Sequence, residues 1–153
     1  MKPTISAKTF AITITTALAL GIAPWAMADD KGCSVETLKG TFGYTSTGVI
    51  LTAQIPALAG PGAEVGTQYF DGKGGVTFTF NSSQNGNISS GTVSGGYKVN
   101  DDCTGTFTEV ETPMFTANFS FVIDKSGDEF QAICQDSGVV DTRTGRRQFR
   151  AGD

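Results

Sequence analysis

The chain has 153 residues, a net charge of −4 and no histidine, and its 20 glycines with many serines and threonines favour short strands over helices. The missing histidine excludes Ser–His and Cys–His nucleophilic catalysis and nearly all zinc and haem sites, and no two cysteines have CxxC metal spacing. The sequence therefore predicts no metal and no cofactor. An acidic chain also repels nucleic-acid phosphates, so no nucleic-acid partner is predicted either.

Residues 1–28 have the pattern of a secretory signal peptide. Two early lysines form a positive start, an apolar run follows over 10–23, and the sequence AMA predicts cleavage after Ala28. The apolar run is short for a membrane span, and no later segment reaches the roughly 20 apolar residues that a spanning helix needs. We therefore expect export to the periplasm or out of the cell. The mature protein is then a single domain over 29–153, with nine basic and fifteen acidic residues and a net charge of −6.

Strand-like runs alternate with turn residues along the mature chain. Period-two alternation of apolar and polar residues is typical of a strand with one buried face. It is clearest over 115–123, where Phe119 and Phe121 alternate with polar neighbours. The same criterion predicts eight strands, at 38–49, 64–70, 75–81, 88–99, 104–111, 115–123, 129–135 and 139–149.

Eight short strands with brief connections predict an all-β fold, an antiparallel up-and-down barrel. Eight is a strand number at which a small sheet can close on itself and so remove its edges. A two-sheet sandwich is the alternative, because alternation alone does not separate the two folds.

An up-and-down barrel places successive turns at alternate ends. The end at which the first strand begins, here called the lower end, receives the short polar turns at 71–75 (DGKGG), 100–105 and 124–128. The upper end receives the long apolar loop at 50–63, a candidate lid, and three shorter turns. DGKGG lacks the spacing of a phosphate loop and the recurring oxygens of a calcium loop. It is therefore predicted to be a hairpin turn at a closed end, in which glycines accept positive φ.

Three cysteines in an exported protein indicate one disulfide and one leftover thiol. In the predicted barrel Cys33 and Cys103 both lie at the lower end, whereas Cys134 lies near the upper end of the seventh strand. Because bridged Cα atoms must lie within about 7 Å of each other, Cys33–Cys103 is the predicted bridge. Cys134 follows two apolar residues and is predicted to be a buried, inert thiol.

Two carboxylates share a face of the fifth strand with Phe107. We expect Glu109 and Glu111 to point outward, because unpaired buried carboxylates are rare; if this face pointed inward, either could act as an acid or base or bind a polar head group.

In the last strand, the later arginines approach the acidic lower turns. We expect these arginines to pair with the acidic residues of the lower turns and not to form an anion site. They are Arg143, Arg146, Arg147 and Arg150.

Four segments carry a family pattern: CSVETLKGTFGY (33–44), GTQYFDGKGGVT (66–77), GGYKVNDDCTGTFT (95–108) and GRR (145–147). They resemble a family of small exported bacterial proteins with the pattern C-S-x-x-x-L-x-G-T-Y-G, then F-D-G-x-G, then Y-x-V-x-x-D-C-T-G-T. That family is similar to the allene oxide cyclase barrel, an eight-stranded relative of the lipocalin-like barrels. The resemblance covers nearly all of the mature chain and implies the barrel and the Cys33–Cys103 pair. It implies no activity, because we match none of the plant cyclase's functional residues to a position here.

Three functions are compatible with this fold. The first is an exported, non-enzymatic barrel that binds a small, mostly apolar molecule, with inward aromatic residues either lining a cavity or filling the core. The second is an isomerase or cyclase of the allene oxide cyclase type, with Glu109, Glu111 or Asn118 as an inward polar group. The third is a structural or cell-surface interaction domain that uses the outer sheet or the 50–64 loop. The candidate lining residues are Phe42, Tyr44, Phe78, Tyr97, Phe119 and Phe121.

Overall fold

A computed structural model of the chain describes residues 32–52, 58–112 and 115–149. The predicted signal peptide, the middle of the predicted upper loop and the side chain of Glu111 lie outside the described part, so the expectations about them stay predictions. Within the described residues, no helix is long and apolar enough to cross a membrane.

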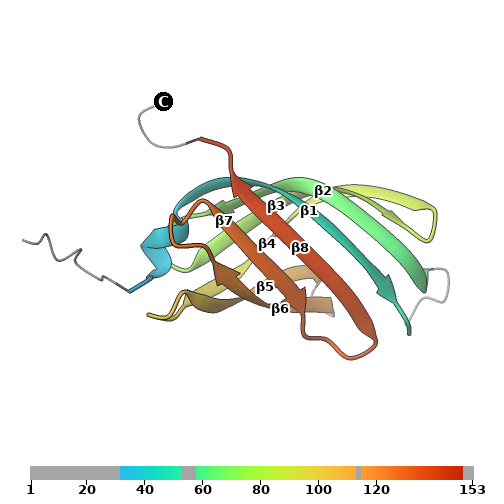
Figure 1. Ribbon diagram of the computed structural model, residues 1–153. Helices are drawn as coiled ribbons and strands as arrows, with labels where there is room; N and C mark the ends of the chain where they lie inside the picture. Colours follow the sequence, from blue (N-terminus) through green and yellow to red (C-terminus); the bar gives the residue numbers. More distant parts are fainter. Residues whose placement is uncertain (1–31, 53–57, 113–114, 150–153) are drawn as a thin grey trace, which may run out of the picture. The chain divides into compact units, whose positions relative to one another are not determined.

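One short 3-10 helix and eight strands make up the described fold (Figure 1). Their bounds are η1 (Val35–Leu38), β1 (Gly40–Ile50), β2 (Gly60–Phe70), β3 (Gly75–Gln84), β4 (Asn87–Val99), β5 (Thr104–Thr112), β6 (Phe115–Ile123), β7 (Glu129–Cys134) and β8 (Val139–Arg147). The number of strands and the bounds of β6 are as predicted. β1 begins later than predicted, because the chain first forms η1, and β2 begins earlier, which shortens the upper loop to 51–59.

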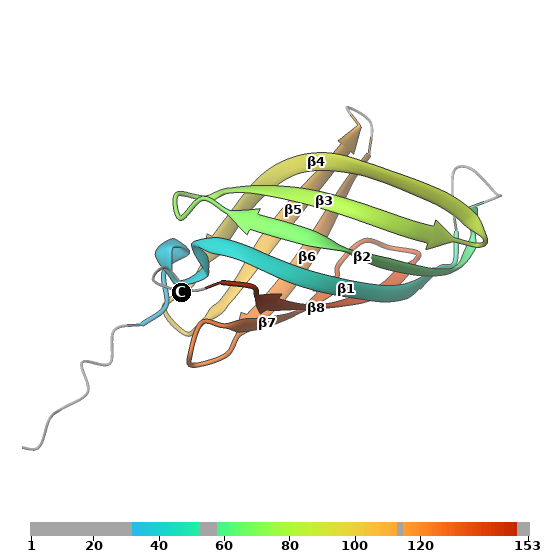
Figure 2. The same ribbon diagram turned by 90° about the horizontal axis from the view of Figure 1, so that it is seen from above.

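The eight strands close into one antiparallel barrel, with β8 paired back to β1 (Figures 1 and 2). β1 pairs with β2 along its whole length and with β8 over 42–50. Closure leaves no free sheet face for a second sheet, so the predicted barrel is confirmed and the sandwich is excluded.

The lower end is closed by η1 and a disulfide. Cys33, just before η1, is bonded to Cys103, with the Cα atoms 4.9 Å apart, and the predicted pairing is confirmed. Leu38, the last residue of η1, is fully buried and packs into the aromatic core. Figure 1 shows η1 in blue at the end of the barrel opposite the β3–β4 turn. The disulfide thus fixes η1 across the lower opening.

The 71–75 segment is the predicted hairpin turn. Asp71 accepts hydrogen bonds of 2.6 and 2.9 Å from two backbone N–H groups of the turn, and these bonds lower the pKa of the carboxyl. Gly72 has a φ of 77°, a conformation that favours glycine. The hydroxyl of Tyr97 accepts a bond from the Gly72 N–H at 3.0 Å and donates to the Val35 carbonyl at 2.7 Å. The turn therefore stabilises the closed end.

Aromatic rings fill the lower half of the barrel. The Phe107 ring centroid lies 4.7 Å from that of Phe119 and 5.6 Å from that of Phe78, and Phe70 lies 4.8 Å from Tyr97. These distances are those of stacked and edge-to-face pairs in protein cores. The buried rings of the core are Phe42, Phe70, Phe78, Tyr97, Phe107, Phe119, Phe121 and Phe130.

The upper half is less completely paired. β4 pairs with β5 only from Ser94↔Val110 downward, so in the described part of the chain residues 87–93 of β4 pair with β3 alone. In both views the β5–β6 pair diverges from the β3–β4 pair toward the upper end (Figures 1 and 2). Solvent therefore reaches inner-wall positions there, including Ser89, which is exposed.

Candidate functional site

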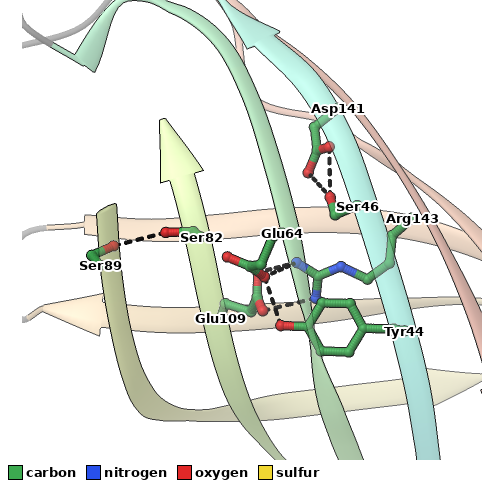
Figure 3. Close-up of polar contacts among 8 residues, drawn as sticks. All are labelled: Tyr44, Ser46, Glu64, Ser82, Ser89, Glu109, Asp141 and Arg143. Atoms are coloured by element: carbon green, nitrogen blue, oxygen red, sulfur yellow. Dashed lines mark hydrogen bonds and ion pairs between the residues drawn. The ribbon is translucent and has the colours of Figure 1, made fainter. Parts of the chain in front are cut away.

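A row of polar side chains crosses the inner wall near the upper end. The strand register places Ser46 opposite both Arg143 and Glu64, and Glu64 opposite Ser82. Ser82 in turn pairs with Ser89, and their hydroxyl oxygens are 2.7 Å apart. Each of the five is in phase with inward residues of its own strand, because side chains alternate along a strand. We call Arg143, Ser46, Glu64, Ser82 and Ser89 the polar row (Figure 3).

Arg143 is the most buried charge of this row, with 3% of its side chain exposed. Nη1 donates to Oε1 of Glu109 at 2.8 Å and Nη2 to Oε2 at 3.1 Å, which is a bidentate ion pair. Nη2 also donates to Oε1 of Glu64 at 3.2 Å. The guanidinium lies 4.3 Å from the ring centroid of Tyr44 and 4.8 Å from that of Phe119. Arg143 therefore separates the aromatic core from the carboxylates.

Two hydroxyl groups bond the outer carboxylates (Figure 3). The Tyr44 hydroxyl donates to Oε1 of Glu64 at 2.6 Å, and the Ser46 hydroxyl lies 2.6 and 2.7 Å from the two oxygens of Asp141. Ser46 has one proton, so it serves one Asp141 oxygen at a time. Within the described residues no hydrogen bond reaches Oε2 of Glu64, whose side chain is 23% exposed. Both carboxylates therefore keep acceptor capacity.

Burial dominates the electrostatics of the site. It raises the pKa of Glu64 above its ordinary value, although the tyrosine hydrogen bond and the Arg143 charge act against it. It also raises the pKa of Asp141, against the serine hydrogen bond. Burial alone would lower the pKa of Arg143, but the charge and hydrogen bonds of Glu109 outweigh it and the pKa is raised. The guanidinium stays charged while Glu64 and Asp141 take up protons more readily than exposed carboxyls.

Two buried polar groups have no hydrogen-bond partner in the described part of the chain. They are Nε of Arg143 and the side-chain amide of Gln68, both of whose polar atoms are unbonded. Gln68 is fully buried on the inward face of β2, and only Gly66, which has no side chain, separates it from Glu64 on that face. An unsatisfied buried polar group costs about 1–3 kcal/mol, so such groups mark places where water or a ligand binds.

All six predicted lining residues point inward and are buried. Three of them, Tyr44, Phe78 and Phe119, also lie against the guanidinium of Arg143. The other three, Phe42, Tyr97 and Phe121, belong to the closely packed rings of the lower half. Their contact with a ligand stays a prediction.

The predicted outward orientation of Glu109 is wrong. It is 5% exposed and paired with Arg143, which compensates a carboxylate that would otherwise be too costly to bury. An inward role for Asn118 is also wrong. That residue is exposed on β6, where its backbone N–H and side-chain amide donate to Asp136 at 2.9 and 2.8 Å.

The arginines of β8 divide between two places. Arg147 pairs with Asp128 at 3.2 Å and Arg146 with Glu129 at 2.9 Å, as expected for charge pairing near the lower end. The same expectation for Arg143 is wrong: it shares the inward phase of Arg147 but lies four residues nearer the upper end, opposite Ser46, where it is buried inside the barrel. Sequence reasoning did not single out Glu64, Asp141 or Gln68. The only available signal was their two-residue spacing from inward positions, which is weak where both faces of a strand carry polar residues.

Other candidate sites are weaker. The described residues include no group of three or more His, Cys, Asp or Glu side chains that could hold a metal ion. Two pockets lie on the outer wall, one of about 140 Å³ at β6 and β7 and one of about 470 Å³ over β1, β2 and β8. Outward residues such as Thr45, Val65 and Thr144 line the larger pocket, and neither pocket contains the unpartnered buried groups found inside the barrel.

No family model matches the chain, and no curated protein matches it. Two solved structures are similar to it. A redesigned β-barrel is 19% identical, with a TM-score of 0.48, over 75% of this chain and 95% of that chain. The S-type phycobiliprotein lyase CPES from Guillardia theta is 9% identical, with a TM-score of 0.43, over 76% of this chain and 92% of that chain. Likenesses this distant transfer no activity.

Proposed function

We propose that this protein is a non-enzymatic β-barrel that binds a small molecule in the upper half of its interior. The observation that carries the proposal is the polar row: charged and hydroxyl side chains line an inner wall that solvent reaches at Glu64, Ser82 and Ser89, and some of their hydrogen-bonding capacity is unused. Membership of the exported barrel family stays a prediction. The disulfide supports a role in an oxidising compartment, where such bonds persist.

A purely structural role explains the polar row less well. Aromatic side chains fill the lower half and stabilise it through apolar burial. Replacing a buried ion pair by well-packed apolar residues is often neutral or stabilising, so a charged interior at one end calls for another reason. Because the lower half is filled, an apolar body can fit only above the aromatic core. The proposed ligand therefore combines an apolar part with a polar group that meets the polar row.

The test is native mass spectrometry of the mature protein purified from its host, with two tryptophan variants. Ser82 faces inward in the polar row, and its neighbour Ser83 faces outward on the same strand. We expect a bound small molecule in the wild type and in Ser83→Trp, and its loss in Ser82→Trp, with all three folded by circular dichroism. A wild type without a ligand that also fails to bind a fluorescent lipid would contradict the proposal. So would a Ser82→Trp variant that binds as the wild type does.

An isomerase or cyclase is a second candidate, and one contact favours it. Glu64 combines a raised pKa with a 2.6 Å hydrogen bond from the Tyr44 hydroxyl, an arrangement that suits proton transfer to a reactive lipid. If so, Glu64→Gln abolishes the conversion of an unsaturated epoxide lipid while it retains binding. The third predicted role, surface interaction through the upper loop, involves residues partly outside the described chain and stays a prediction.

A further inference from the structure

We propose that the ligand of this barrel carries an organic cation, such as a primary ammonium group, which binds to Glu64 and Asp141 at the polar row. The inference rests on the proposed function and names the chemistry of the head group. Three observations support it: the net negative charge of the site, the hydrogen bonds that already occupy Arg143, and the unpartnered amide of Gln68.

The upper interior has more negative than positive groups. Three carboxylates, Glu64, Glu109 and Asp141, surround Arg143, and within the described residues Arg143 is the one basic side chain on this part of the inner wall. With all groups ionised the site has a net charge of about −2, and water screens these partly buried charges less than it screens surface charges. Such a site attracts a cation and repels an anion.

Arg143 offers little to an anionic ligand. Both of its terminal nitrogens already donate to Glu109, and one donates to Glu64 as well. Three of its five N–H groups are in these bonds, and the others, including Nε, lie on a side chain that is only 3% exposed. In contrast, Glu64 has an oxygen that no described residue bonds, on a side chain that is 23% exposed, and Asp141 shares one serine proton between two oxygens. Both carboxylates therefore keep unused acceptors, which a donor-rich cation satisfies.

Gln68 is the independent observation. Its amide is fully buried, has no partner in the described chain and lies on the inward face of β2 below Glu64. Its carbonyl oxygen needs a donor and its NH2 group needs acceptors, and bound water can supply both.

A metal ion fits this place less well than an organic cation. The described carboxylates do not form a metal-binding group, because the planar guanidinium lies among them. Phe80 is half-buried one register row below Glu64 and provides apolar surface for the body of a ligand. The expected ligand class is therefore a small amphipathic amine.

The affinity for such a cation should rise with pH, because burial raises the pKa of Glu64 and of Asp141 and the cation binds their ionised forms. The charged and titratable groups that face Glu64 are Tyr44 from β1, Glu109 from β5, and Asp141 and Arg143 from β8. Of these, the tyrosine has a pKa raised by burial and the arginine stays charged, so the carboxyls set the pH dependence.

The experiment compares octylamine, octanol and octanoate by isothermal titration calorimetry on the mature protein at constant salt. The three probes share one apolar chain and differ in charge. We expect octylamine to bind at least tenfold more tightly than either of the others, and its affinity to fall as the pH is lowered and the carboxyls take up protons. Octanol or octanoate binding as tightly as octylamine would overturn the cation inference and leave the proposed function standing. Absence of binding by all three, in a barrel that also lacks a host ligand, would overturn both.

Matched variants test the position of the cation. Glu64→Gln should remove most of the octylamine preference, and Asp141→Asn provides a second test if the first variant folds poorly. Glu129→Gln is the control, since Glu129 lies on β7 near the lower end, paired with Arg146 and outside the site. An octylamine preference unchanged in both site variants would contradict the assignment.

Discussion

Arg143→Met tests whether the buried ion pair holds the upper half of the barrel together. The substitution removes a bidentate pair whose side chains are 3% and 7% exposed and leaves Glu109 buried without its counter-charge. Breaking a buried pair from one side costs about 3–5 kcal/mol. Methionine keeps a long apolar side chain against the rings of Tyr44 and Phe119, so little of this cost comes from lost packing.

Urea unfolding followed by circular dichroism measures the effect, because the single tryptophan, Trp25, lies in the predicted signal peptide. With a slope of about 1.5 kcal/mol per molar urea, the midpoint should fall by about 2–3 M. The double variant Arg143→Met/Glu109→Leu should recover most of this loss, because the orphaned carboxylate is then gone. A single variant that loses less than about 1 kcal/mol, or a double variant that is no more stable than the single one, would refute the reasoning.

Four further outcomes follow from the same structure. Reduction of the Cys33–Cys103 bridge, which spans 70 residues, should lower the free energy of unfolding by about 4 kcal/mol in urea titrations, and an unchanged midpoint would contradict this. Tyr97→Phe leaves two backbone groups at the closed end unpaired and should cost about 1–3 kcal/mol, whereas a neutral result would show that water replaces the hydroxyl. Because the folded pKa of Glu64 is raised, its contribution to stability is present at low pH and lost as pH rises through that pKa; Glu64→Gln should therefore gain stability relative to the wild type as pH rises above 4.5, and parallel pH profiles would argue otherwise. Cys134 is buried with a raised pKa, so it should react with a thiol reagent only on unfolding, and rapid labelling of the folded protein would disprove its burial.

The strands and their order could be predicted because they depend on local patterns. In β6, Phe119 and Phe121 alternate with polar neighbours, and this period of two gives both the strand and its buried face. Short turns between such strands force an up-and-down order, and that order brings Cys33 and Cys103 to one end. The glycines of the 71–75 turn are explained in the same way, by the φ values that a tight turn requires.

The orientation of the charged residues could not be predicted in this way. Glu109 alternates with Thr108 and Val110, a pattern that fits either face, and average burial favours a carboxylate outside. It lies inside because Arg143, 34 positions later, reaches it across the barrel. The free energy of burying a charge depends on its partner, and the partner is not visible in the local sequence.

The sequence by itself thus determined the strand number, the closed lower end, the disulfide and the aromatic core, because alternation, turn chemistry and cysteine position are properties of neighbouring residues. Only the tertiary structure decided that the interior has two parts, rings below and the polar row above. The row is built from β8, β1, β2, β3 and β4, and its ion pair extends to Glu109 of β5. Strand register and barrel closure bring these side chains together, and both arise from pairing between segments far apart in the chain.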